Sequence, residues 1–123
     1  MEMINIPNYV IEWTDKYFHQ SAFDVPVNYP SKKVLKFFVH FKKPDKVTLY
    51  RGVNKYNKDN REITSWTYDK KIAENYIKDG GKIMEKEFPS ENILLDTTTL
   101  NTKQKKLLGY DYKIDDKEVL III

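Results

Sequence analysis

Cysteine is absent from this 123-residue chain. Without thiols the chain can form neither a disulfide framework nor a zinc site with cysteine ligands, and we expect a reducing compartment. Glycine is also scarce, with 4 residues, and neither the G-x-G-x-x-G fingerprint nor the phosphate-binding G-x-x-x-x-G-K-S/T motif occurs. These absences disfavour a doubly wound nucleotide-binding fold.

Long hydrophobic runs are missing as well. The longest purely apolar stretch is residues 119–123, which is much too short to span a bilayer. No basic segment followed by an apolar one precedes Asn8, so no secretory leader is indicated. We therefore expect a cytoplasmic protein without a membrane partner.

The charges are numerous but nearly balanced, with 21 basic and 18 acidic residues and a formal net charge of +3. A phosphate-bearing ligand is compatible with this small excess, which does not by itself indicate nucleic acid. Hydrophobic residues make up 41% and aromatic residues 14%, which is too apolar for a disordered chain. The length predicts a single domain spanning residues 1–123.

Helical spacing dominates the start of the chain. Apolar residues recur at helical spacing over residues 8–19, which predicts a first helix. Ser31 is a candidate cap for a second helix, which carries an apolar stripe and ends before Pro44. We therefore expect residues 1–46 to form a helical N-terminal part.

From residue 47 onward the pattern changes to β-rich segments. The predicted strands are residues 47–51, 62–66, 83–88, 92–96 and 118–123. The last strand is apolar on both faces after its first residue, which is typical of a strand in the middle of a sheet. The two strands on either side of Pro89 are predicted to form a hairpin or a neighbouring pair.

Two short helices are predicted among these strands. Asp69 and Asn101 are their candidate N-caps, and Gly80 and Gly109 are expected to end them. Helices first and mostly strands later indicate an α+β domain, in which N-terminal helices pack on a largely antiparallel sheet or pair of sheets.

Two strand segments carry side chains suited to ligand binding. Arg51 ends a β-rich strand beside Gly52, where a guanidinium can contact a phosphate or a carboxylate through paired hydrogen bonds. Ser65 and Thr67 lie on one face of an extended segment, and Trp66 points to the other face. The structural alternatives are a surface salt bridge for Arg51 and a strand edge with a core tryptophan for the second segment.

A third element is Glu118, which opens the apolar final strand two residues after Asp116. A carboxylate at the mouth of a buried strand can hold a sugar hydroxyl and face positive charge that develops on a sugar ring. The structural alternative is a charged strand end that blunts the sheet. The residues alone leave both interpretations open.

The combination and order of these elements resemble the arginine, serine, glutamate class of mono-ADP-ribosyltransferases. SWTYDKKIAENY at residues 65–76 looks like the S-W-T-x-D-x-x-x-A-x-x-F/Y version of that class's Ser-x-Ser element in bacterial and phage members. FPSENIL at residues 88–94 is similar to the strand and turn that often follow. The resemblance covers roughly residues 47–123.

This resemblance implies an ADP-ribosyltransferase fold, with a mostly antiparallel split β-sheet or β-sandwich and residues 47–123 as the NAD-binding core. It implies an enzyme that uses NAD as a substrate, cleaves its bond to nicotinamide, and transfers ADP-ribose to a protein of the host or cell. No metal is implied. For a phage-encoded or toxin-like protein, the expected location is the host cytoplasm.

The resemblance also assigns roles to residues. Arg51, beside Gly52, would grip the NAD pyrophosphate or the nicotinamide-side ribose. Ser65 with Thr67 would brace the active site and position the catalytic glutamate. Glu118 would accept a hydrogen bond from the 2′-hydroxyl of the nicotinamide ribose.

Two positions are less defined by the resemblance. Trp66 would either stack on nicotinamide or pack in the core. Asp116 stands where the family usually has Glu or Gln, a residue that helps select and activate the acceptor. Arginine is therefore not implied as the acceptor residue.

Three alternatives to protein modification stay open. An NAD glycohydrolase would use the same chemistry with water as the acceptor. A non-catalytic phage or bacterial module on the same fold would bind and inhibit a host protein. Nucleic-acid binding is the weaker rival, because the basic residues are interleaved with acids and the only dense basic run near the site is Lys103, Lys105 and Lys106.

Overall fold

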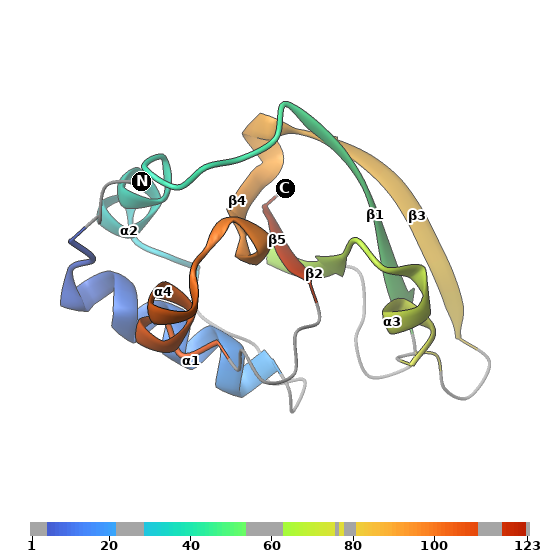
Figure 1. Ribbon diagram of the computed structural model, residues 1–123, viewed down its shortest axis with the longest axis horizontal. Helices are drawn as coiled ribbons and strands as arrows, with labels where there is room; N and C mark the ends of the chain where they lie inside the picture. Colours follow the sequence, from blue (N-terminus) through green and yellow to red (C-terminus); the bar gives the residue numbers. More distant parts are fainter. Residues whose placement is uncertain are drawn as a thin grey trace.

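Four helices and five strands make up the described part of the chain, which comprises residues 5–21, 29–53, 63–75, 77, 81–110 and 117–122 of a computed structural model. The α+β class is as predicted (Figure 1). The elements are α1 (Asn8–Ser21), α2 (Lys32–Phe38), β1 (Lys46–Val53), β2 (Ile63–Thr67), α3 (Lys70–Glu74), β3 (Lys82–Pro89), η1 (Ser90–Asn92), β4 (Ile93–Asp96), η2 (Thr97–Thr99), α4 (Thr102–Leu107) and β5 (Glu118–Ile122).

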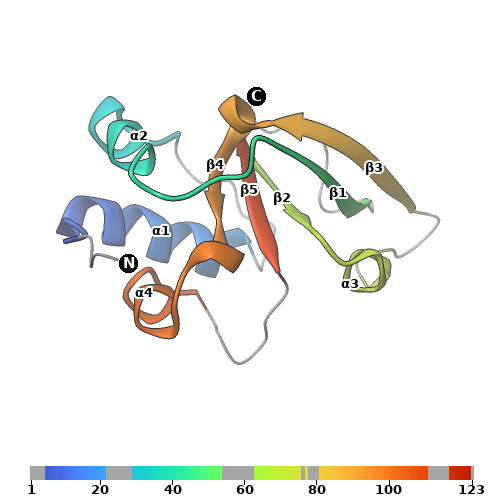
Figure 2. The same cartoon turned by 45° about the horizontal axis from the view of Figure 1, so that its top comes forward.

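The strands form one antiparallel sheet in the order β3-β1-β2-β5-β4, which can be followed in Figure 2. β1 pairs with β3 at eight positions, and β2 pairs with β5 at five. β1 and β2, in contrast, pair only through Tyr50 and Thr67 among the described residues. The sheet therefore divides between β1 and β2 into a two-stranded part and a three-stranded part.

The predicted pairing of the two strands around Pro89 is wrong, because β3 and β4 lie at opposite edges of the sheet. The 3-10 turn η1 separates them, and the amide of Ser90 donates to the carbonyl of Asp45 at 2.8 Å. All four residues of β4 are buried, whereas most of β3 is exposed or half-buried. β4 therefore pairs with the apolar β5, whose predicted position inside the sheet is confirmed.

Two apolar clusters lie on the two faces of the sheet, because alternate residues of β5 belong to different clusters. The helix-side cluster contains Val10, Trp13, Tyr17, Val34, Phe38, Phe41, Leu94, Leu95, Leu100, Leu108 and Leu120. The strand-side cluster contains Val47, Leu49, Trp66, Phe88, Ile93, Val119 and Ile121. Figures 1 and 2 show α1, α2 and α4 grouped beside β4, with α3 beside β1.

The helices begin where the sequence predicts. In α1, the first amide donors bond to the carbonyl of Pro7. The Ser31 hydroxyl caps α2, and the Asp69 carboxylate caps α3 by accepting from the Lys71 amide at 2.9 Å. α4 begins with a reciprocal capping box between Asn101 and Gln104.

Two helices end earlier than predicted. α2 ends at Phe38, where the chain tightens into a turn, and the Phe38 carbonyl accepts a hydrogen bond from the Lys43 ammonium at 2.6 Å. α3 ends at Glu74, where the Asn75 amide bonds back to Ile72 and Ala73. No helix in the described residues combines the length and apolarity needed to cross a bilayer.

Gly109, which follows α4, has a φ of +80°, and replacing it should destabilise the protein. A Cβ at this position would lie 2.5 Å from Oδ1 and 3.0 Å from Cα of Asp15 in α1. Gly109→Ala is therefore expected to lower the free energy of unfolding by about 2–3 kcal/mol in urea titrations, because backbone strain adds to overpacking. Gly109→Asn relieves part of the backbone strain but keeps the clash. An alanine variant as stable as wild type would contradict the prediction.

Candidate functional site

Arg51 lies in β1 at the point where β1 separates from β2. The preceding residue, Tyr50, forms the pairing with β2, and the Arg51 guanidinium Nη1 donates to the backbone carbonyl of Ser65 at 2.7 Å. The arginine is only 8% exposed, and Gly52 beside it is also buried. Arg51 is therefore an internal cation that bridges the division in the sheet, not a surface arginine.

Ser65, Thr67 and Glu118 share one face of the sheet. Thr67 in β2 lies directly opposite Glu118 in β5, and Ser65 lies opposite Leu120. Directly opposite residues and alternate residues along a strand point to the same face. Since Leu120 belongs to the helix-side cluster, the hydroxyl pair and the carboxylate lie on the helix side.

Arg51 and Glu118 leave the sheet from opposite faces. Alternation along β1 places Arg51 on the side of Leu49, which belongs to the strand-side cluster. The contacts thus link the predicted site residues as two pairs, Arg51 with Ser65 and Thr67 with Glu118. The guanidinium of Arg51 and the carboxylate of Glu118 therefore lie on different faces of the sheet.

Trp66 points away from Ser65 and is 4% exposed. Its ring packs edge-on against Phe88, with centroids 4.8 Å apart, and its indole Nε1 donates to the Thr64 hydroxyl at 2.8 Å. These contacts favour the core-packing interpretation of Trp66 over stacking on nicotinamide. Asp116 lies outside the described residues.

Tyr17 in α1 contributes a hydroxyl that the sequence analysis did not single out. Its oxygen lies 2.7 Å from the Ser65 Oγ, and the tyrosine is 5% exposed. A buried tyrosine hydroxyl requires a polar partner, but helical spacing does not reveal which one. The bond ties α1 to β2 directly over Ser65.

A second group of polar side chains, which the sequence did not predict as functional, surrounds the start of β5. The Tyr68 hydroxyl donates to Oδ2 of Asp96 at 2.5 Å, and Asp96 is 1% exposed. The other carboxylate oxygen accepts from the amide and the hydroxyl of Thr98, at 3.0 and 2.7 Å. The Thr97 hydroxyl donates to the Glu118 carbonyl at 2.6 Å. The only sequence signal was an acid before three threonines, a pattern typical of a capped turn.

No protein-family model, curated protein or solved structure matches the chain. Its function therefore has to be inferred from its own residues. Among the described residues, no group of three or more His, Cys, Asp or Glu side chains is placed to hold a metal ion.

Tyr68 should resist ionisation in alkaline solution. Burial, together with the hydrogen bond to Asp96 and its charge, raises the pKa of Tyr68 well above its ordinary value of 10.0. Because the folded-state pKa is the higher one, the stabilisation is complete below about pH 10 and is lost as pH rises through the folded pKa. In an ultraviolet titration of phenolate absorbance, Tyr68→Phe should match wild type near pH 10. A signal lower by about half a tyrosine at that pH, the share expected of a tyrosine with the ordinary pKa, would contradict this expectation.

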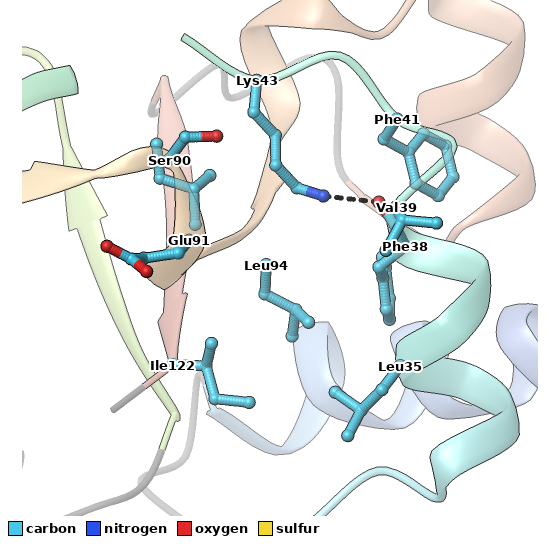
Figure 3. Close-up of a pocket in the computed structure, with 10 residues that line it drawn as sticks. Leu35, Phe38, Val39, Phe41, Lys43, Ser90, Glu91, Leu94 and Ile122 are labelled. Atoms are coloured by element: carbon cyan, nitrogen blue, oxygen red, sulfur yellow. Dashed lines mark hydrogen bonds between the residues drawn. The ribbon is translucent and has the colours of Figure 1, made fainter. Parts of the chain in front are cut away.

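A cavity of about 490 Å³ lies between α2 and the sheet (Figure 3). Its walls include the apolar side chains of Phe38, Leu94 and Ile122, and Lys43 extends over it to the Phe38 carbonyl. Burial lowers the pKa of Lys43 from its ordinary value of 10.5. Ile122 is at the opposite end of β5 from Glu118, so this cavity is separate from the Arg51–Ser65 and Thr67–Glu118 pairs.

Proposed function

We propose that the protein cleaves the glycosidic bond between nicotinamide and ribose in NAD and transfers ADP-ribose to a protein acceptor. The observation that carries the proposal is the contact of Arg51 with Ser65, two residues before the Thr67 that pairs with Glu118. The three sequence elements of the resemblance thus occupy neighbouring positions on β1, β2 and β5. Their order along the chain is the one on which the resemblance rests.

Glu118 supplies the carboxylate in this proposal. When the bond breaks, nicotinamide leaves with the bonding electron pair, and positive charge develops on the ribose C1′ and the ring oxygen. A carboxylate fixed at a strand end accepts the hydrogen bond of the 2′-hydroxyl and stabilises that charge as it forms. Its contribution therefore falls mainly on the transition state, after which the acceptor's nucleophile attacks C1′.

Arg51 holds the pyrophosphate of NAD in this proposal. A guanidinium recognises phosphate oxygens through paired hydrogen bonds. The bond from Arg51 to the Ser65 carbonyl fixes the guanidinium before NAD arrives, which lowers the cost of ordering it on binding.

The test is release of nicotinamide from NAD by the purified wild-type protein. No release at protein concentrations comparable to that of NAD would overturn the proposal. In cell lysate, NAD labelled in its ADP-ribose portion separates the two acceptors. Label on a macromolecule supports transfer, and free ADP-ribose alone identifies an NAD glycohydrolase.

A second candidate function is non-catalytic inhibition of a host protein. The bond between Tyr17 and Ser65 favours it, because α1 then covers the hydroxyl that an active site would use. Intact NAD after prolonged incubation, together with partner capture that Glu118→Ala leaves unchanged, would support this function over catalysis.

A further inference from the structure

The backbone immediately before Glu118 is in an unusual conformation. Lys117 has a φ of 48°, the only positive φ of a non-glycine residue among the described residues. This left-handed conformation is unfavourable for a residue with a Cβ, so surrounding contacts have to hold it. The Lys117 carbonyl accepts from the Tyr68 amide at 3.4 Å, and its ammonium lies 4.0 Å from Oδ2 of Asp69.

A side chain holds the start of β5 from the β4 side. Thr97 follows β4 directly and is fully buried. Its hydroxyl donates to the carbonyl of Glu118 at 2.6 Å, which continues the β4–β5 pairing by one further hydrogen bond. On its β4 side, the carbonyl of Glu118 is therefore held by a side-chain hydroxyl.

The Tyr68–Asp96 hydrogen bond joins the two strands that flank β5. Tyr68 follows β2, and Asp96 ends β4 opposite Val119 of β5. Tyr68 also packs against the strand-side cluster, of which Val119 is a member. The tyrosine ring therefore crosses β5 beside Val119, on the face opposite to Glu118.

A β-bulge in β4 puts Asp96 within reach of Tyr68. The register shifts between Ile93 and Leu95, and both Leu94 and Leu95 join the helix-side cluster. Simple alternation from Ile93 would turn Asp96 to the helix side, whereas the extra residue returns it to the face of Val119. Bulges redirect side chains in this way, often next to functional sites.

We propose that Tyr68, Asp96 and Thr97 form a clamp on the start of β5 and act as positioning residues for Glu118. The inference rests on the proposed function, in which the Glu118 carboxylate has to face the ribose. None of the three side chains contacts NAD in this account. Loss of the clamp therefore weakens transition-state stabilisation and leaves ground-state binding of NAD largely unchanged.

The kinetic test uses Tyr68→Phe and Thr97→Val in the full-length chain. Each variant should lower kcat for nicotinamide release about 10- to 100-fold, because small misplacements of a catalytic group have effects of this size. KM for NAD should stay within about threefold of wild type. Thr97→Ser keeps the hydroxyl and should restore kcat. A kcat equal to wild type in both variants, or an effect confined to KM, would overturn the proposal.

Matched controls separate positioning from general destabilisation. Tyr9→Phe removes a hydroxyl from a half-buried tyrosine in α1, and Thr14→Val removes one from a fully buried threonine. Both controls should keep the wild-type kcat. If they lose as much activity as the clamp variants, the clamp has no specific role.

Amide hydrogen exchange tests the clamp without relying on catalysis. Tyr68→Phe and Thr97→Val should speed exchange at Glu118 and Val119 by about tenfold or more relative to the controls, because local opening becomes easier. Unchanged exchange would overturn the clamp. If wild type releases no nicotinamide but exchange responds as expected, the proposed function fails and the clamp stands.

Discussion

Glu118→Gln is expected to lower kcat for nicotinamide release by about 100- to 1,000-fold, the usual effect of removing a group that stabilises developing charge. Glutamine has nearly the same shape but no negative charge to place beside the ribose. NAD affinity should change by less than about threefold, because the charge on the sugar exists only in the transition state. Steady-state kinetics and direct titration with NAD measure the two quantities.

Glu91→Gln is the matched control for this substitution. Glu91 is an exposed carboxylate in η1, beside the cavity at the opposite end of β5 from Glu118. The change should leave kcat at the wild-type value. Circular dichroism should show an intact fold for both variants, since the buried Val119, Leu120 and Ile121 hold β5 in the sheet. Full activity of Glu118→Gln would remove Glu118 from the mechanism.

Local signals in the sequence were enough to locate most elements. Capping side chains at Ser31, Asp69 and Asn101 mark helix starts because they satisfy amides within three residues of themselves. The apolar run in β5 indicates burial on both faces, which requires strands on either side. Such information is contained in a few consecutive residues and does not depend on the rest of the fold.

Partners distant in sequence could not be predicted in the same way. Tyr17 and Ser65 are 48 residues apart, and Tyr68 and Asp96 are 28 apart. The pairing predicted around Pro89 failed because a short connection was taken to join neighbouring strands. β4 pairs instead with β5, a strand that the chain reaches only after α4.

The candidate site contains features that the sequence predicts and features that it does not. The types and order of Arg51, Ser65 and Glu118 were visible in the sequence, but their faces were not. A face is set by the register of each strand, and a shift by one residue reverses it. The bulge in β4 is such a shift, and it turns Asp96 to the face on which Tyr68 lies.

Arg51→Ala is expected to weaken NAD binding by about 10- to 100-fold, since hydrogen bonds to charged groups are worth about 1.5–3 kcal/mol. The substitution also removes the donor to the Ser65 carbonyl, so the free energy of unfolding should fall by about 1–3 kcal/mol. Arg51→Lys keeps the charge but not the planar fork and should bind NAD with intermediate affinity. NAD titration and urea unfolding measure the two effects separately.

Lys43→Ala separates these two effects of Arg51. Lys43 is half-buried and Arg51 is buried, and each donates to a backbone carbonyl, at 2.6 Å for Lys43 and 2.7 Å for Arg51. Lys43→Ala removes a comparable hydrogen bond to a backbone carbonyl, beside the cavity at the Ile122 end of β5. It should leave NAD affinity unchanged. If Lys43→Ala weakens NAD binding as much as Arg51→Ala does, the loss reflects general destabilisation. If only Arg51→Ala weakens it, the guanidinium at the division between β1 and β2 is the anionic-ligand contact of the site.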